Sequence, residues 1–242
     1  MKSIGIIGFG RFGRLAAKYL KSDFDVYAYD KQDLSETAEE IGVNFLSIEE
    51  VCKKDIILLC VPISEIDNII KEISSLLNKD SIVIDTCSVK EYPVAVMKKH
   101  LPGSVEIIGT HPMFGPDSAS GSLKGRSIVL SPIRINNNKF ESVKNYLENK
   151  GLNMIESTPE EHDRQIARSL CLTHVIGRTM IDMGLSEQDI STLGYERLLK
   201  ILETVKNDTW QLFLDMNRFN KYAEITRKNF ISSLKKIDNN LK

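Results

Sequence analysis

Short apolar runs alternate with helical patterns along the first 157 residues. Residues 56–61 are continuously apolar, as expected for a central strand of a parallel sheet, and isoleucines then recur at helical spacing from Ile66 to Ile73. This alternation predicts an α/β fold with a doubly wound, mostly parallel sheet. The expected strands are residues 3–7, 26–29, 56–61, 81–84, 105–108, 127–130 and 152–155.

The pattern changes at residue 158. Thr158, Pro159 and Glu161 match a capping box with proline at the first helical position, and only helical patterns follow. We expect a sheet domain over residues 1–157 and a smaller all-helical domain over residues 158–242, which docks on the sheet domain, on a second copy, or on both. Asp208 is expected to cap the helix that begins near Trp210.

A glycine-rich segment, G-F-G-R-F-G at residues 8–13, directly follows the first strand. In this position the glycines permit a tight turn, a close approach of backbone to a pyrophosphate, and close packing of helix on strand. The second strand ends at Asp30, where a carboxylate for a ribose hydroxyl is expected, although a turn-starting Asp is the alternative. The pattern predicts a Rossmann-type domain that prefers NAD to NADP, since Asp30 repels a 2′-phosphate, although the neighbouring Lys31 moderates that preference. The expected cofactor-binding residues are Gly8, Phe9, Gly10, Arg11, Phe12, Gly13, Asp30, Cys60, Val61, Pro62 and Ser88.

Three polar side chains are candidates for chemistry. His111 follows an apolar run and begins a Gly/Pro-rich loop, so we expect it at the carboxyl end of a strand, where open α/β sheets bind ligands. A histidine that braces the loop is the alternative. Ser88 follows another strand, where it could also cap the next helix. His174 lies on an apolar helical stripe, which by itself is more typical of a core histidine.

Composition narrows the class of ligand. The 242 residues contain 32 Lys and Arg against 33 Asp and Glu, so no basic field favours nucleic acid or a membrane surface, and a small metabolite is the expected partner. The four cysteines are scattered, which indicates neither a zinc site nor disulfides, and no metal ligand set is expected. The first residues are too short an apolar run for a signal peptide, so we expect a complete, cytoplasmic chain.

Together these motifs resemble the prephenate and arogenate dehydrogenase family, and especially its plant arogenate-type branch. The matching stretches run in family order across nearly the whole chain. They are I-G-F-G-R-F-G at residues 7–13, S-V-K-E-Y-P at 88–93, T-H-P-M-F-G-P at 110–116, E-H-D at 161–163, T-H-V-I-G-R at 173–178 and G-Y-E-R-L-L at 194–199.

The resemblance implies NAD-dependent oxidative decarboxylation of prephenate to 4-hydroxyphenylpyruvate in tyrosine biosynthesis. His111 would take the ring hydroxyl proton, Ser88 would orient the imidazole and the hydroxyl, and His174 would line the site beside nicotinamide and substrate. The family also suggests a homodimer through the helical domain. The implied substrate-binding residues are Ser88, His111, Met113, Gly115, His174, Arg178 and Lys200.

Two positions depart from the family pattern. Many bacterial members bind a substrate carboxylate with an Arg roughly nine residues before a Trp, but that count from Trp210 reaches Ile201, beside Lys200. Arg178, Arg197 or Lys200 would replace it, and Arg178 is favoured because it shares a helix face with His174, although Asp182 is its alternative partner. Plant-type members often carry an acidic residue where this chain has Gly121, so prephenate and arogenate both stay open.

Three other functions remain as alternatives. The first is an arogenate dehydrogenase that yields tyrosine directly. The second is a β-hydroxyacid or imine-type reductase, although those enzymes use a catalytic Lys or Asp where this chain offers His174. The third is a nonenzymatic NAD-binding redox sensor, which would not need Ser88, His111 and His174 to converge.

Overall fold

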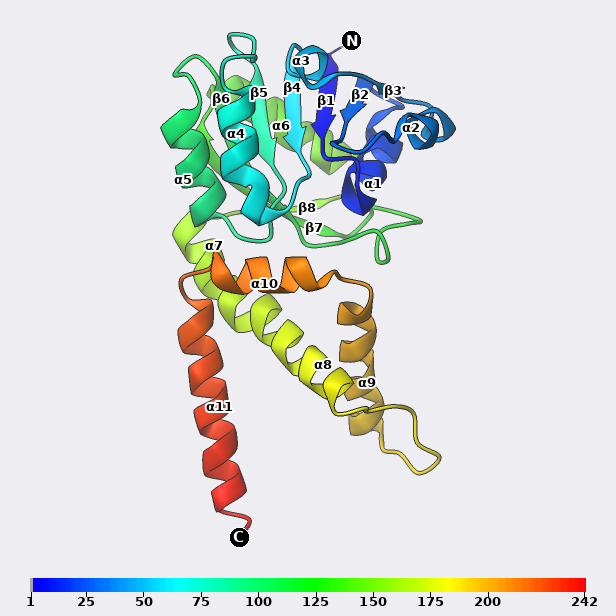
Figure 1. Ribbon diagram of the computed structural model, residues 1–242, viewed down its shortest axis with the longest axis vertical. Coiled ribbons are helices and arrows are strands. Elements are labelled where there is room, and N and C mark those ends of the chain that lie inside the picture. Colours follow the sequence, from blue (N-terminus) through cyan, green and yellow to red (C-terminus); the bar gives the residue numbers. More distant parts are fainter. Residues whose placement is uncertain (1) are drawn as a thin grey trace. The chain divides into compact units, whose positions relative to one another are not determined.

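The computed structural model describes residues 2–242 (Figure 1). The chain forms two compact units, the first ending at Glu160 and the second running from Glu161 to Lys242. The predicted boundary between residues 157 and 158 lies close to this division.

The first unit is built on one eight-stranded sheet with the order β3-β2-β1-β4-β5-β6-β7-β8. All neighbouring strands are parallel except β6 and β7, which pair antiparallel. The predicted mostly parallel α/β sheet is therefore confirmed. The strands are β1 Ser3–Ile7, β2 Asp25–Tyr29, β3 Asn44–Phe45, β4 Ile56–Leu59, β5 Ile82–Asp85, β6 Glu106–Pro112, β7 Ser127–Arg134 and β8 Asn153–Glu156.

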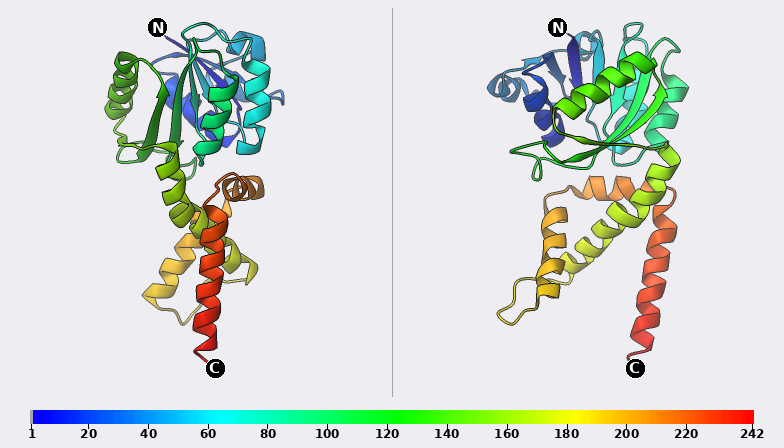
Figure 2. Two further views of the ribbon diagram at one scale, coloured as in Figure 1. Left: turned by 90° about the vertical axis from the view of Figure 1, so that its left-hand side faces the viewer. Right: turned by 180° about the vertical axis from the view of Figure 1, so that it is seen from behind.

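Helices cover both faces of this sheet. Figure 2 shows α6 on one face and α4 and α5 on the other. Crossover helices between parallel strands must lie on the faces, so both faces are apolar and the central strands are buried. The helices of this unit are α1 Arg11–Leu20, α2 Ser35–Ile41, α3 Ile48–Val51, α4 Ile66–Ile73, α5 Glu91–His100 and α6 Asn137–Asn149, with a short 3₁₀ turn at Ile63–Glu65.

The segment between β2 and β4 contains elements that the apolar pattern did not predict. These are α2, β3 and α3, each of seven residues or fewer. α3 begins with a capping box in which Ser47 accepts a hydrogen bond from the Glu50 amide and Glu50 accepts one from the Ser47 amide. Elements this short carry too few apolar positions to show a period.

The second unit is helical throughout. Its elements are α7 Pro159–Ile166, whose first two residues belong to the first unit, a π-helical turn at Ala167–Cys171, α8 Leu172–Asp182, α9 Leu193–Lys206, α10 Trp210–Arg218 and α11 Ala223–Asn239. The π turn interrupts the single helix that the apolar stripe predicted. The predicted cap of α10 is wrong by one residue, because the Thr209 hydroxyl, and not Asp208, accepts the hydrogen bond from the Leu212 amide at 3.1 Å.

Candidate active site

The glycine-rich turn between β1 and α1 has the conformation that its sequence predicts. Gly8 has a φ of +95°, and a Cβ there would lie 2.5 Å from the carbonyl oxygen of Cys60. A Cβ on Gly13 would lie 2.1 Å from the carbonyl oxygen of Gly8. Both positions therefore require glycine for the fold itself.

Gly10 differs from these two glycines. Apart from Gly10 and its neighbours along the chain, no heavy atom of residues 2–242 lies within 4 Å of a Cβ placed there, so the space beside its backbone is open. Gly10 is also the N-cap of α1, and in the described chain no side chain caps this helix and no acidic residue lies in its first turn. An open glycine at an uncapped helix N-terminus fits the pyrophosphate of a dinucleotide, which binds where backbone amides and the helix dipole favour negative charge.

Asp30 lies directly after β2 and contacts the same turn. Its Oδ2 accepts a hydrogen bond from the Phe9 amide at 2.7 Å, and its Oδ1 accepts one from the Gln32 amide at 3.1 Å. The carboxylate thus braces the glycine-rich turn and starts a local turn, as the alternative interpretation of Asp30 expected. Its position beside the turn also suits a ribose hydroxyl.

The other expected cofactor residues surround the carboxyl ends of the first strands. Cys60 and Val61 follow β4 and are half-buried. Burial raises the pKa of the Cys60 thiol to about 12, so this thiol is not a nucleophile at neutral pH.

The Arg11 guanidinium forms an exposed ion pair with Asp117 at 2.6 Å, which ties α1 to the loop after β6. The Phe12 ring lies 6.5 Å from that of Phe114 in the same loop. Pro62, Met113 and Gly115 also lie in these loops, with Met113 exposed.

A buried ion pair lies at the end of β5. Lys90 and Asp85 are both fully buried, and the Lys90 ammonium contacts Asp85 Oδ1. Asp85 Oδ1 also accepts a hydrogen bond from the Cys87 amide at 3.0 Å, and the Asp85 carbonyl accepts one from the Thr110 hydroxyl at 2.6 Å. Burial raises the pKa of the Asp85 carboxyl, and the Lys90 ammonium opposes that rise. The pair holds the turn after β5 against the residue that precedes His111.

Sequence reasoning missed this pair. The available signal was a lysine five residues after the acidic end of a buried strand, within the S-V-K-E-Y-P stretch. A buried lysine needs a partner, but the burial of Lys90 follows from the packing of α5 on the sheet, so the spacing alone did not indicate the contact.

Ser88 lies in the turn after β5, and His111 lies in the neighbouring strand β6. Ser88 follows β5 and is 9% exposed, and in the described chain its Oγ is buried without a hydrogen-bond partner. Lys90 is the N-cap of α5, so the interpretation of Ser88 as a helix cap is wrong. His111 is 6% exposed and lies inside β6 opposite Val129 of β7, one residue before the strand ends rather than in the loop. Since β5 and β6 are parallel, both side chains lie at the carboxyl edge of the sheet.

His174 is buried in the helical unit on α8. Its Nε2 lies 3.4 Å from Asp208 Oδ2, and in residues 2–242 its buried Nδ1 has no hydrogen-bond partner. Burial, together with the nearby positive charge of Arg178, lowers the pKa of His174 to about 4. The imidazole is therefore neutral at physiological pH and presents a ring nitrogen that the protein leaves unsatisfied.

Arg178 makes contacts that the sequence did not predict. Its Nη2 donates to the carbonyl oxygens of Asp208 at 2.5 Å and Thr209 at 3.4 Å, rather than to Asp182. The guanidinium also lies 5.0 Å from the Trp210 ring centroid and 5.5 Å from that of Phe213. These contacts stabilise the turn before α10 and leave less of the guanidinium for a substrate carboxylate. Lys200 is exposed on α9.

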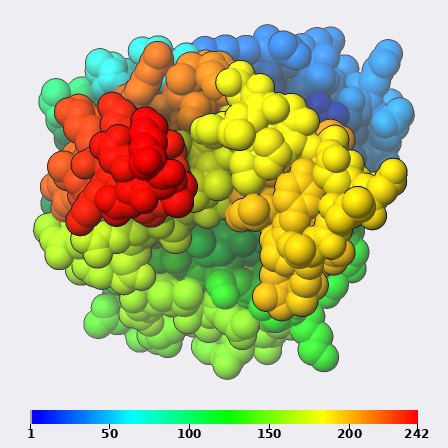
Figure 3. All heavy atoms as spheres, turned by 90° about the horizontal axis from the view of Figure 1, so that it is seen from below, coloured from blue at the N-terminus to red at the C-terminus, as the bar shows by residue number. Residues whose placement is uncertain are grey.

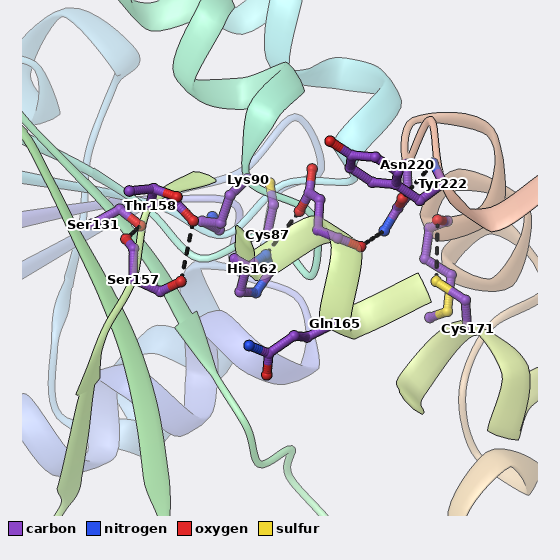
Figure 4. Close-up of polar contacts among 12 residues, drawn as sticks. Cys87, Lys90, Ser131, Ser157, Thr158, His162, Gln165, Cys171, Asn220 and Tyr222 are labelled. Atoms are coloured by element: carbon purple, nitrogen blue, oxygen red, sulfur yellow. Dashed lines mark hydrogen bonds and ion pairs between the residues drawn. The ribbon is translucent and has the colours of Figure 1, made fainter. Parts of the chain in front are cut away.

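A second histidine of the helical unit, His162, was not chosen as a site residue. Its Nδ1 lies 2.7 Å from Asp163 Oδ1, and both side chains are buried on α7. Asn220 is directed toward α7 and donates to the Asp163 carbonyl at 2.8 Å, while the Cys171 thiol in the π turn lies 3.5 Å from the Met216 carbonyl oxygen (Figure 4). The E-H-D stretch places His162 next to Asp163 and so indicated this histidine. The contact of α7 with the segment before α11 depends on the tertiary structure.

Neither a metal site nor a membrane span is found in the described chain. In residues 2–242, no three His, Cys, Asp or Glu side chains gather where they could hold a metal ion. No helix of this range is long and apolar enough to cross a membrane.

Comparison with protein families identifies relatives for both units. The model described as prephenate dehydrogenase, nucleotide-binding domain, matches residues 16–156. A model described as TYRAAT1-like, C-terminal domain, matches residues 179–242. The first range begins after the glycine-rich turn, so that turn is an observation independent of the match.

Individual relatives resemble nearly the whole chain. It is 33% identical over 230 residues to arogenate dehydrogenase 2 of Arabidopsis thaliana, a match that covers 91% of this chain and 64% of that protein. It is 30% identical over 250 residues to a probable arogenate/prephenate dehydrogenase of Methanocaldococcus jannaschii, covering 97% of this chain and 56% of that protein. The chain therefore spans less than two thirds of the length of these two curated relatives.

Solved structures share the fold. The crystal structure of prephenate dehydrogenase from Aquifex aeolicus in complex with hydroxyphenyl propionate and NAD⁺ has a TM-score of 0.79 at 22% identity, covering 99% of this chain and 90% of that one. That of Synechocystis arogenate dehydrogenase has a TM-score of 0.70 at 20% identity, covering 98% and 91%. At this identity the likeness concerns the fold.

Proposed function

The chain belongs to the prephenate/arogenate dehydrogenase family, and from that premise we propose that it catalyses NAD-dependent oxidative decarboxylation of prephenate to 4-hydroxyphenylpyruvate. The observation that carries the proposal is that Ser88, in the turn after β5, and His111, near the end of the neighbouring strand β6, share the sheet edge where the glycine-rich turn lies. A serine hydroxyl without a partner and a buried histidine at the carboxyl edge of such a sheet suit a hydroxyl-bearing substrate.

The chemistry requires one base at one hydroxyl. His111 accepts the proton of the ring hydroxyl while the ring carbon that bears this hydroxyl loses its hydride. That carbon thereby becomes a carbonyl carbon. The carbonyl withdraws electrons from the ring, so the carboxylate leaves as carbon dioxide and the ring becomes aromatic. Aromatisation makes the step irreversible. A positioned base of this kind contributes about a hundredfold or more to the rate.

Ser88 and His174 have supporting roles in this proposal. The Ser88 hydroxyl can accept a hydrogen bond from the substrate or donate one to the His111 imidazole, which would satisfy an Oγ that the protein leaves unpaired. His174 stays neutral because of its lowered pKa, so it acts as a hydrogen-bonding group and not as a cation for a substrate carboxylate. The candidates for the group that binds a substrate carboxylate are therefore Arg178 and two exposed residues of α9, Arg197 and Lys200.

NAD is the proposed cofactor and, when bound, supplies the hydride acceptor. Gly10 and the N-terminus of α1 would hold its pyrophosphate, and Asp30 would face its ribose hydroxyls. Because the Asp30 carboxylate is negatively charged, it disfavours the 2′-phosphate of NADP. Lys31 is engaged with Glu65 at 3.0 Å and offers the 2′-phosphate a weaker attraction than a free lysine would.

Arogenate is the second candidate substrate. It is favoured by the names of two Arabidopsis thaliana relatives, arogenate dehydrogenases 2 and 1, which are 33% and 30% identical to this chain. Prephenate and arogenate differ only in the side chain, which carries a keto group in one and an amino group in the other. The reaction at the ring, and the role of His111, are the same for both.

The test is NADH formation by the purified protein with prephenate and arogenate offered separately, each with NAD and with NADP. We expect turnover of at least one substrate and a higher kcat/KM with NAD. The ratio of kcat/KM values for the two substrates identifies the side chain that is recognised. Absence of turnover with both substrates, in protein that binds NAD, would overturn the proposed reaction and favour the redox-sensor alternative.

A further inference from the structure

The first unit contains an apolar cavity of about 360 Å³ on one face of its sheet. Its floor is formed by β1, β4 and β5, and its walls are helices α1 and α6. The residues that matter for its shape are Leu58 and Ile84 on the floor, Ala16 and Leu20 on α1, and Val143 and Leu147 on α6. The cavity separates two buried apolar clusters of the core, one on β1 and β2 and one on β6 and β7, which share only Ile56.

Contacts beyond the C-terminal end of α1 tie the two walls together. Asp23, which follows α1, accepts a hydrogen bond from the Tyr146 hydroxyl at 2.9 Å and pairs with Lys150 at 2.5 Å, both on or beside α6. The Phe24 and Tyr146 rings lie 4.9 Å apart. The Tyr19 hydroxyl, also near the C-terminal end of α1, donates to the carbonyl of Ala119 in the loop after β6 at 2.7 Å. These contacts fix the position of α1 relative to α6, and the cavity between them opens to solvent.

The hydroxyl groups on the wall are already satisfied within the protein. The hydroxyls of Thr86 and Thr110 donate to backbone carbonyls at 2.8 and 2.6 Å, and that of Ser142 donates to the Asn138 carbonyl at 2.8 Å. At the rim, Lys139 pairs with Glu106 at 2.6 Å. A ligand that carried charge or several hydrogen-bonding groups would lose its hydration here and gain few partners.

We propose that this cavity binds a small, uncharged aromatic molecule of one or two rings. Native cores contain few voids larger than a water molecule, and an apolar cavity of about 150 Å³ already stays dry and binds benzene. Roughly twice that volume fits a bicyclic ring. The site goes beyond the proposed dehydrogenase function and is separate from the expected substrate residues, because its lining includes neither Ser88 nor His111.

The cavity nevertheless adjoins the catalytic edge. Phe12 of the glycine-rich segment and Thr110 and Pro112, which flank His111, belong to its lining. An occupant would therefore contact the α1 end that is proposed to hold the pyrophosphate and the strand that carries the proposed base. Such a ligand is placed to influence both cofactor binding and turnover.

Indole serves as the probe in the test, measured by isothermal titration calorimetry on the full chain. We expect saturable binding with a Kd below about 1 mM. Ala16→Leu places a larger apolar side chain in the cavity and should weaken indole binding at least about tenfold. Lys18→Leu, on the exposed side of the same helix, is the matched control and should bind indole as the wild type does.

Val143→Phe fills the cavity from the α6 wall and gives a second, independent variant should Ala16→Leu fail to fold. Circular dichroism and thermal unfolding verify that each variant is folded. Absence of saturable indole binding to the wild type would overturn the proposal. The proposal would also be overturned if both filled variants still bound indole and if prephenate or arogenate displaced it. Indole would then occupy the substrate site. Because the readout is binding and not turnover, the result stands apart from the test of the dehydrogenase reaction.

Discussion

His174 is a buried imidazole whose surroundings contain one negative and one positive group. Asp208 Oδ2 lies 3.4 Å from its Nε2. Burial is the main cause of the lowered pKa of His174, and the positive charge of Arg178, four residues along the same helix, lowers that pKa further. The Arg178 guanidinium itself donates to the Asp208 carbonyl. The three residues form one local arrangement in which a neutral imidazole is preferred.

This arrangement predicts a pH-dependent contribution to stability. The unfolded chain binds a proton at His174 below about pH 6.5, whereas the folded protein does so only below about pH 4. Protons therefore favour the unfolded state, and as pH falls from 6.5 to 4 the wild type should lose up to about 3 kcal/mol of unfolding free energy relative to His174→Gln. Urea unfolding of both proteins at several pH values measures the difference. Parallel pH profiles would contradict the neutral buried imidazole.

Replacement of His111 separates its proposed role as a base from a structural role. His111→Asn keeps a polar side chain in β6 but removes the group that accepts the proton, so kcat should fall at least about a hundredfold. The Kd for NAD should stay within about twofold. Steady-state NADH formation and calorimetry with NAD measure the two quantities.

His100→Asn is the control for the loss of a histidine, because His100 lies at the end of α5 and is not among the proposed site residues. It should retain wild-type turnover. If His111→Asn lost NAD affinity and turnover together, the histidine would be a brace for the loop and not the base.

At the scale of single elements, the glycine-rich turn combines two requirements that the sequence motif does not distinguish. Gly8 and Gly13 are glycines because the neighbouring backbone leaves no room for a Cβ, whereas Gly10 has open space beside it. The first two therefore serve the packing of α1 on β1, and Gly10 serves the proposed ligand. In the turn after β5, structural and ligand-binding roles also belong to different residues. The buried Asp85–Lys90 pair fixes the backbone, and the Ser88 hydroxyl is left available.

A pair of alanine variants tests this division. Gly13→Ala should lower the free energy of unfolding by about 2 kcal/mol, because its Cβ would lie 2.1 Å from the Gly8 carbonyl oxygen. Gly10→Ala should change stability by less than about 1 kcal/mol but weaken NAD binding at least about tenfold. Chemical denaturation and NAD titration supply both values for each variant. Equal loss of stability in both would argue against a ligand role for Gly10.

At the scale of the whole molecule, the helical unit leaves apolar side chains at its surface. Ile231, Leu234 and Ile237 on α11 are 47%, 57% and 59% exposed, and their spacing places them on one stripe of that helix. Figure 3 shows the atoms at the C-terminal end of α11 at the surface, in red. A stripe of this kind is expected to be covered by another apolar surface, and the family suggests that the partner is a second copy.

We therefore predict a homodimer in solution that depends on this stripe. Leu234→Lys should shift the protein toward monomer and raise the dimer Kd at least about tenfold, because a lysine ammonium would be desolvated in the interface. Ser232→Lys, on the opposite side of α11, should leave the equilibrium unchanged. Sedimentation velocity over a range of protein concentrations measures the monomer–dimer equilibrium. A wild-type protein that is monomeric at every concentration would refute the prediction.

The sequence by itself determined the fold class, seven of the eight strands in their order along the chain, the glycine-rich turn and the residues at the strand ends. These depend on local patterns, since a buried parallel strand is apolar along its length and a tight turn needs glycine wherever it occurs. Even the change to an all-helical unit was visible at Thr158 and Pro159, where α7 begins. The π turn between α7 and α8 was not, because its residues have the same apolar spacing as a regular helix.

Only the tertiary structure decided the partners of individual polar groups. Lys90 was part of a recognised motif, yet its burial against Asp85 depends on how α5 packs on the sheet. Arg178 was expected to face a substrate or Asp182, but the turn before α10 brings the carbonyls of Asp208 and Thr209 to it. The apolar cavity between α1 and α6 likewise arises from segments more than a hundred residues apart, and contacts at that separation leave no periodic signal in the sequence.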